Sequence, residues 1–189
     1  CLSAWHTDIN GLQAHGIIPY SSKLELLPAF LQQLHMESLG KSKTIDGEIN
    51  THLASPIIFG DIGTRSQHSL SQYFMQAPTM VPLDILYLEQ DKDSANKRLV
   101  AHAKAQSQVL WNGFEDAVEP YKDIAAKHAH TLIQIKELTP CALGSLLAMY
   151  EHKVFTLGVM YNINMFDQWG VERGKLIAKQ ILGHKTTDE

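Results

Sequence analysis

Five polar side chains in this sequence have the types and spacing that acid–base chemistry needs. Gln33 and Glu37 are four residues apart, so a helix would place both on one face. Gln168 and Lys175 are seven residues apart, close to two helical turns, and would share a face in the same way. His68 follows a glycine-rich turn. A carboxylate can remove a carbon-bound proton next to a carbonyl, while an imidazole and an ammonium can move protons on sugar oxygens during ring opening.

A simpler interpretation exists for each of these residues. Polar residues on one helix face are most often solvated, and periodicity alone favours this for Gln168 and Lys175. A histidine in the first turn of a helix, as expected for His68, is more often solvated or capping than catalytic. If the amide and the ammonium do point together, they would suit an anionic, hydroxyl-rich ligand. The spacing does not establish that the five side chains meet in space.

Composition excludes several classes of protein. The chain has 189 residues, 44% of them hydrophobic and 19% charged, as expected for one globular domain with a proper core. A net charge of −4 gives no basic surface for nucleic acid. The two cysteines, Cys1 and Cys141, have no zinc-ligand spacing and form no disulfide framework, which favours a reducing, cytoplasmic compartment. The most apolar run, residues 143–159, is interrupted by charged residues, which argues against a membrane span. Because the chain opens with Cys1, we expect a fragment of a longer protein.

Apolar runs and helical periods alternate along the chain. The segment 81–88 is almost continuously apolar, as expected for a strand covered on both faces, with Asp84 as the exception. Thr139 and Pro140 are a typical helix start, and Thr64 or Ser66 is the expected cap of the helix that carries His68. Alternating strands and helices predict an α/β fold with a parallel sheet and helices on both faces. The expected strands are 16–20, 56–59, 81–88 and 130–135, and the expected helices are 22–34, 67–76, 94–113, a helix from 140 and a short one ending near 182.

One stretch near the end of the chain is dense in distinctive residues. The run Phe-Asp-Gln-Trp-Gly-Val-Glu-Arg-Gly-Lys at 166–175 resembles the C-terminal signature of the glucose-6-phosphate isomerase (phosphoglucose isomerase) family. The resemblance continues backwards in the same order and covers nearly the whole chain. It includes Tyr-Glu-His-Lys-Val-Phe at 150–155, Ser-Gln-His-Ser at 66–69, Met-Glu-Ser-Leu-Gly-Lys at 36–41 and Ile-Pro-Tyr at 18–20.

The resemblance implies a role for each of the five polar residues. Glu37 matches the general base that moves a proton between C2 and C1 through a cis-enediol, and Gln33 matches a glutamine lining the sugar-phosphate site. His68 matches the histidine that assists ring opening, supplied from the neighbouring subunit of a homodimer. Lys175 matches the lysine at the ring oxygen, and Gln168 the glutamine near the phosphate. The implied reaction interconverts glucose 6-phosphate and fructose 6-phosphate in glycolysis and gluconeogenesis. It needs no metal or organic cofactor, because acid, base and oxyanion stabilisation are sufficient.

The resemblance also implies a domain organisation. It makes residues 1–189 the second sugar-isomerase (SIS) domain, a three-layer α/β/α sandwich with a C-terminal helical segment, from the C-terminal half of a two-SIS-domain enzyme. The family's upstream phosphate-gripping loop and enediolate-stabilising arginine have no match in the chain. We therefore expect the isolated chain to be inactive.

Some positions depart from the family pattern. Gly-Asp-Ile-Gly-Thr-Arg-Ser at 60–66 stands where the family has Gly-Glu-Pro-Gly-Thr-Asn-Gly, and Ala95 and Asn96 stand near its paired histidines. The altered turn bears directly on the aim of His68. The altered turn and the absent upstream residues leave a second hypothesis, a non-catalytic sugar-phosphate-binding or interaction module that kept the SIS fold.

Overall fold

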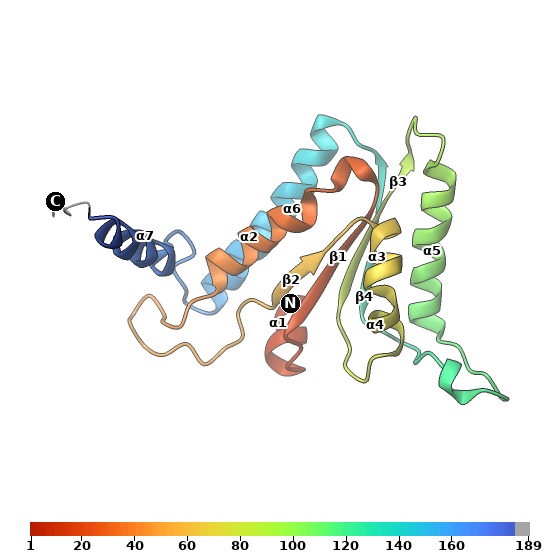
Figure 1. The fold of residues 1–189 in the computed structure, drawn as a ribbon, viewed down its shortest axis with the longest axis horizontal. Helices are drawn as coiled ribbons and strands as arrows, with labels where there is room; N and C mark the ends of the chain where they lie inside the picture. The colour runs from red at the N-terminus through yellow and green to blue at the C-terminus, as the bar shows by residue number, and fades with distance from the viewer. Residues whose placement is uncertain (184–189) are drawn as a thin grey trace.

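The centre of the protein is a parallel sheet of four strands in the order β2-β1-β3-β4 (Figure 1). The computed structural model describes residues 1–183. Gly16 of β1 pairs with Leu83 of β3, and Leu83 pairs in turn with His130 of β4. Two parallel strands that pair must be joined by a crossover segment, and the helices supply these segments. The strands are β1 (Ala14–Tyr20), β2 (Ile57–Gly60), β3 (Leu83–Gln90) and β4 (His130–Glu137).

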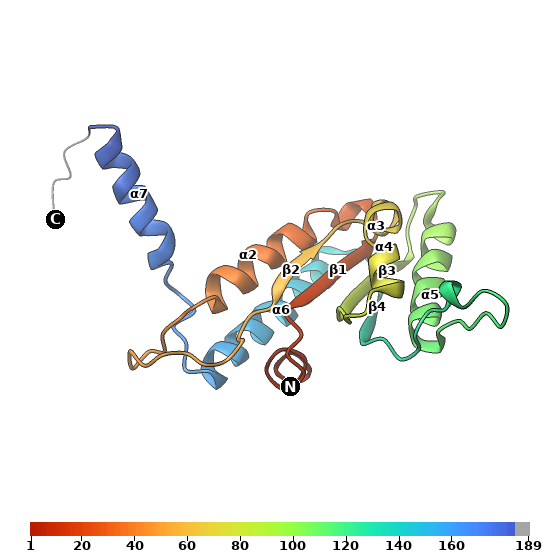
Figure 2. The same cartoon turned by 60° about the horizontal axis from the view of Figure 1, so that its bottom comes forward.

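Helices cover both faces of the sheet, giving three layers (Figure 2). One face carries α2 (Leu27–Leu39) and α6 (Pro140–Met160). The other carries α4 (Ser71–Gln76) and α5 (Asn96–Asn112), with α3 (Gly63–Ser69) beside them. The predicted α/β/α sandwich with a parallel sheet is confirmed. The shorter elements are α1 (Leu2–Ala4), the π-helix η1 (Trp5–Ile9) and the 3-10 turns η2 (Ser22–Leu24) and η3 (Pro120–Lys122).

Neighbouring residues of the central strands face opposite cores. Ile17 and Leu86 pack with the buried side chains of α2 and α6, whereas Ile18 and Ile85 pack with those of α4 and α5. Because side chains alternate along a strand, a strand covered on both faces must be apolar at nearly every position. The apolar run at 81–88 predicted a strand covered on both faces, and β3 confirms this prediction.

The last two helices differ in how they join the body. The Thr139 hydroxyl accepts a 3.1 Å hydrogen bond from the Ala142 amide, which confirms the predicted start of α6. After α6 the chain turns, and α7 (Trp169–Ile181) projects away from the three layers (Figures 1 and 2). Within the described part of the chain, α7 has no fully buried residue. Packing against the three layers therefore does little to fix the position of α7.

The predicted start of the helix carrying His68 is wrong. Neither Thr64 nor Ser66 caps it, because α3 already begins at Gly63 with the apolar Ile62 as its N-cap. The Ser66 hydroxyl instead donates to the Asp61 carbonyl at 2.9 Å from inside the helix. The helical segment also divides at Leu70, so α3 and α4 replace the one continuous helix that was expected.

None of the helices in residues 1–183 is both long enough and apolar enough to cross a membrane.

Candidate active site

Helix α2 holds Gln33 and Glu37 on its exposed side. Four of its buried positions recur every four residues and form one stripe against the sheet and α6; they are Leu27, Leu31, His35 and Leu39. Gln33 and Glu37 lie midway between members of this stripe, so the helix period turns both side chains outward. The helix extends beyond the predicted end near Leu34, and Glu37 therefore sits in its last turn. The predicted shared face of these two residues is confirmed.

The loop after α6 brings Gln168 to Glu37. Tyr161 and Ile163 of this loop are buried with Leu39, which anchors the loop against the C-terminal end of α2. Glu37 and Gln168 consequently line the same open hollow of about 650 Å³. A hollow of this size lies in the range of small-molecule sites. Two of the five predicted residues thus line one hollow, although 131 positions separate them in the sequence.

Lys175 lies outside this hollow. Gln168 is the N-cap of α7, with a non-helical φ of −145°, so the helical period does not relate its direction to that of Lys175. The expectation that both project from one helix face is therefore wrong. The Lys175 ammonium forms a 2.9 Å ion pair with Glu172 on its own helix, and this pair is largely exposed to solvent. Gln33, one turn before Glu37 on α2, is likewise absent from the described residues that line the hollow.

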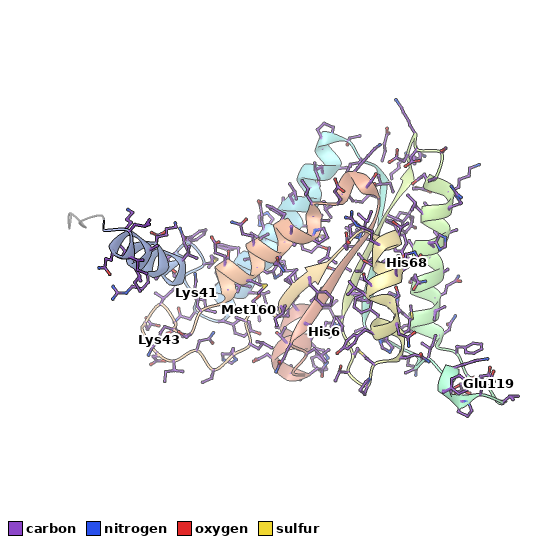
Figure 3. All side chains as sticks on the ribbon, viewed as in Figure 1. His6, Lys41, Lys43, His68, Glu119 and Met160 are labelled. Carbon is purple, nitrogen blue, oxygen red and sulfur yellow. The ribbon has the colours of Figure 1, made fainter. Side chains whose placement is uncertain are left out.

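His68 lies far from this hollow. Figure 3 shows Lys41, which lines the hollow, on the side of the sheet toward α7, and His68 on α3 on the other side. Helix α3 follows the carboxyl end of β2, whereas Glu37 lies at the end of α2, which runs back toward the amino ends of the strands. The His68 side chain is exposed. One copy of the chain therefore does not bring His68 to Glu37.

Side-chain contacts of the residues just before His68 hold its turn in place. Arg65 pairs with Asp61 at 2.6 Å, and this hydrogen bond keeps the pKa of the Asp61 carboxyl below its ordinary value. The Gln67 amide donates to the Tyr20 hydroxyl at 3.2 Å. Burial raises the pKa of Tyr20 to about 12, against the smaller effect of this hydrogen bond. The departures at Asp61 and Arg65 thus form a local ion pair in the turn that leads to His68.

A buried polar cluster supports the sheet face on which α2 lies. The Asp84 carboxylate of β3 accepts a 2.8 Å hydrogen bond from the Tyr150 hydroxyl and lies 3.2 Å from Nε2 of His15. Burial alone would raise the pKa of Asp84, but the contacts with His15 and Tyr150 and the charge of Lys153 lower it to about 2. Asp84 is therefore a buried anion whose charge is balanced by its neighbours.

Sequence reasoning gave several of these residues no role. Asp84 was visible as the one acid in an apolar strand, a signal that a buried partner must exist. Lys41 and Asp167, which join the two segments beside the hollow, gave no such signal because 126 positions separate them. Among residues 1–183, no group of three or more His, Cys, Asp or Glu side chains is arranged to hold a metal ion.

The whole chain matches the model of a known protein family. The model of the family described as "Phosphoglucose isomerase" matches residues 1–189. The chain belongs to the phosphoglucose isomerase family. A glucose-6-phosphate isomerase of Coxiella burnetii (strain CbuG_Q212) is 41% identical over 201 aligned residues, which cover 96% of this chain. One from Aspergillus oryzae is 37% identical over 195 residues, covering 95% of this chain.

Solved structures agree with this family assignment. The crystal structure of a glucose-6-phosphate isomerase from Chlamydia trachomatis matches with a TM-score of 0.89 at 37% identity, over 96% of this chain and 37% of that one. A hypothetical protein from Thermus thermophilus matches with a TM-score of 0.72 at 23% identity, over 95% of this chain and 44% of that one, and shows the same fold. This chain spans 37% of the Coxiella relative and 35% of the Aspergillus one. Phosphoglucose isomerases of this kind are thus nearly three times as long as the chain.

Proposed function

We propose that this chain is the second SIS domain of a longer enzyme that interconverts glucose 6-phosphate and fructose 6-phosphate. The observation that carries the proposal is that Glu37 and Gln168 line one hollow, within a chain that matches the phosphoglucose isomerase family along its whole length. Glu37 serves as the base that takes the proton from C2 and returns it to C1 through a cis-enediol. Gln168 offers an amide donor to the sugar phosphate.

The other three residues complete the proposed site in the full-length dimer. Gln33 lies one turn before Glu37 on the same exposed side of α2 and extends the sugar-binding wall. Lys175 reaches the ring oxygen once the rest of the enzyme orients α7, because exchanging its exposed contact with Glu172 costs little. The exposed His68, on the opposite side of this copy, serves the site of the neighbouring subunit. We place this homodimer in the cytoplasm, in keeping with two exposed free cysteines.

The same features motivate a second candidate function. His68 and Lys175 both lie outside the hollow that contains Glu37, and the turn before His68 holds an Asp61–Arg65 ion pair. A protein that kept only the binding wall would take up a sugar phosphate without converting it. This second candidate is a non-catalytic sugar-phosphate-binding or interaction module with the SIS fold.

An assay of the full-length protein separates the two functions. Fructose 6-phosphate is supplied, and formation of glucose 6-phosphate is followed through a coupled NADP-dependent dehydrogenase. The isomerase proposal expects turnover well above the rate without protein. Absence of turnover, together with saturable binding of fructose 6-phosphate by calorimetry, would instead support the binding module.

A further inference from the structure

We propose that Lys41 is a positioning residue that fixes Gln168 relative to Glu37. The expected effect on catalysis rests on the proposed isomerase function, whereas the contacts of Lys41 do not depend on it. Lys41 follows the end of α2 by two residues, and its ammonium turns back toward the helix. The Lys41 ammonium thereby joins α2, which carries the proposed base Glu37, to the loop that carries Gln168, the proposed phosphate-binding residue.

The first half of the connection is made to α2. The Lys41 ammonium donates a 2.9 Å hydrogen bond to the backbone carbonyl of Glu37. Carbonyls in the last turn of a helix lack partners within the helix, and a cation there also interacts favourably with the helix dipole. The contact therefore stabilises the helix end at the residue that carries the proposed base.

The second half is made to the loop before α7. The same ammonium lies 3.1 Å from Oδ1 of Asp167 and also donates to the Asp167 backbone carbonyl. Asp167 directly precedes Gln168 in the chain. Its second carboxylate oxygen accepts a 2.8 Å hydrogen bond from the Asn164 side chain, which orders the loop from within. Fixing Asp167 at both its backbone and its side chain leaves Gln168 little freedom to leave the hollow.

The partners of Lys41 favour a positioning role over direct substrate binding. An ammonium has three N–H donors, and three oxygen atoms from Glu37 and Asp167 already surround this one. The Lys41 and Asp167 side chains are only 17% and 28% exposed, so solvent screens their attraction less than that of a surface pair. A substrate phosphate would have to displace these contacts before it could bind Lys41.

The surrounding contacts explain why this one lysine matters. Helix α7 has no fully buried residue in the described chain, and the loop before it is anchored at its beginning, where Tyr161 and Ile163 are buried with Leu39. A second attachment lies at the loop's beginning, where the Ile45 amide donates to the Asn162 carbonyl at 2.8 Å. Lys41 acts at the other end of the loop, next to Gln168. Its removal should therefore free Gln168 while the loop's beginning stays attached.

The test uses the full-length protein with Lys41→Met, Asp167→Asn and the double variant. Each single change should lower kcat by about 10- to 100-fold, because a displaced Gln168 would hold the substrate about 1 Å from its productive position at Glu37, and a misplacement of this size costs on this scale. The kcat of the double variant should lie within about twofold of that of the less active single variant, because both changes remove the same interaction. Lys41→Arg keeps a cation that can reach Asp167 and should recover part of kcat.

A matched control comes from another lysine–aspartate pair. Lys23 of η2 and Asp91, directly after β3, form a 2.7 Å ion pair beyond the carboxyl ends of β1 and β3. Lys23→Met and Asp91→Asn should leave kcat within about twofold of the parent, because neither residue lines the hollow that contains Glu37 and Gln168. An unchanged kcat in Lys41→Met would overturn the proposal. So would a raised KM with an unchanged kcat, because that pattern would mean that substrate binding is weakened while the substrate stays correctly placed at Glu37.

A second measurement separates this proposal from the proposed function. Hydrogen–deuterium exchange is followed in the full-length protein for peptides that cover residues 162–169. Lys41→Met should speed exchange there by about tenfold or more, because the loop opens locally, while the Lys23→Met control should not. This result can be obtained even if the protein has no isomerase activity, in which case only the proposed function fails. Unchanged exchange in Lys41→Met would overturn the positioning role.

Discussion

The Tyr150 hydroxyl donates a 2.8 Å hydrogen bond to the Asp84 carboxylate, joining α6 to β3 inside the protein. Tyr150 is 1% exposed and Asp84 6% exposed, so both partners are largely shielded from water. Removing a donor from a buried acceptor costs more than the bond's net contribution, because the acceptor keeps its full desolvation penalty.

The first prediction concerns this bond. Tyr150→Phe should lower the free energy of unfolding by about 1–3 kcal/mol, because the Asp84 carboxylate loses a buried donor. The measurement is a urea titration of the chain followed by circular dichroism. Tyr73→Phe is the control, because Tyr73 bonds Thr79 at the surface and its loss should change the free energy by less than about 0.5 kcal/mol. Equal effects of the two changes would contradict the assigned role of Tyr150.

The second prediction concerns acid sensitivity. His35 is 2% exposed, and its pKa is lowered to about 3 by burial first and then by the charges of Lys153 and His15, against the opposing charge of Asp84. Between its ordinary pKa near 6.5 and this value, the unfolded chain binds a proton that the folded one does not. The contribution of His35 to stability should therefore fall as pH drops below about 6.5, by up to about 1.4 kcal/mol per pH unit.

Substitution of His35 checks this sign. In His35→Met, the free energy of unfolding should fall less steeply than in the parent as pH is lowered from about 6.5 to 4.5. His152→Gln, which changes an exposed histidine on α6, is the matched control and should keep the parental slope. If His35→Met kept the parental slope, another group would be responsible for the acid sensitivity.

These buried groups show where sequence reasoning succeeds and where it stops. Apolar runs and helical periods predicted the strands and the sandwich, because a sheet covered on both faces leaves few other solutions. The start of α3 was missed because its N-cap is Ile62, while Ser66, the expected cap, donates to Asp61 from inside the helix. Sequence patterns assign a polar residue the role that is commonest at its position. They cannot show that its side chain is hydrogen-bonded elsewhere in the fold.

The candidate site divides in the same way. Helical spacing placed Gln33 and Glu37 on one side of α2, since a single regular element sets both directions. It failed for Gln168, whose backbone is non-helical, and its direction follows from the anchored loop instead. The contact of Lys41 with Asp167 joins distant segments and has no local pattern. Only the folded chain shows such a contact.

The third prediction concerns the proposed base. In the full-length protein, Glu37→Gln should lower kcat by about 10²- to 10⁴-fold, because the amide cannot accept the C2 proton while its size and exposure are preserved. The coupled assay with fructose 6-phosphate measures this, and circular dichroism verifies the fold. Glu115→Gln, at an exposed position away from the hollow, should keep parental kcat. Near-parental activity in Glu37→Gln would show that another group is the base.

The last prediction concerns His68 and the neighbouring subunit. If each site takes Glu37 from one subunit and His68 from the other, Glu37→Gln and His68→Ala subunits should complement each other when mixed. A mixed dimer would contain one site in which both residues are intact and one in which both are replaced. Random reassociation makes half the dimers mixed, so about a quarter of parental activity should return.

The controls for this experiment are the two variants assayed alone and a mixture of Glu37→Gln with Glu37→Gln/His68→Ala subunits. Neither variant alone has an intact site, and no pairing in the second mixture restores Glu37. Activity should therefore appear only in the mixture of the two single variants, and only after the subunits have exchanged. If that mixture stayed as inactive as its parts, His68 would act within its own subunit or have no part in the reaction. In the first case, a single chain would have to bring α3 to the end of α2, across the whole length of a parallel sheet whose packing opposes such a movement.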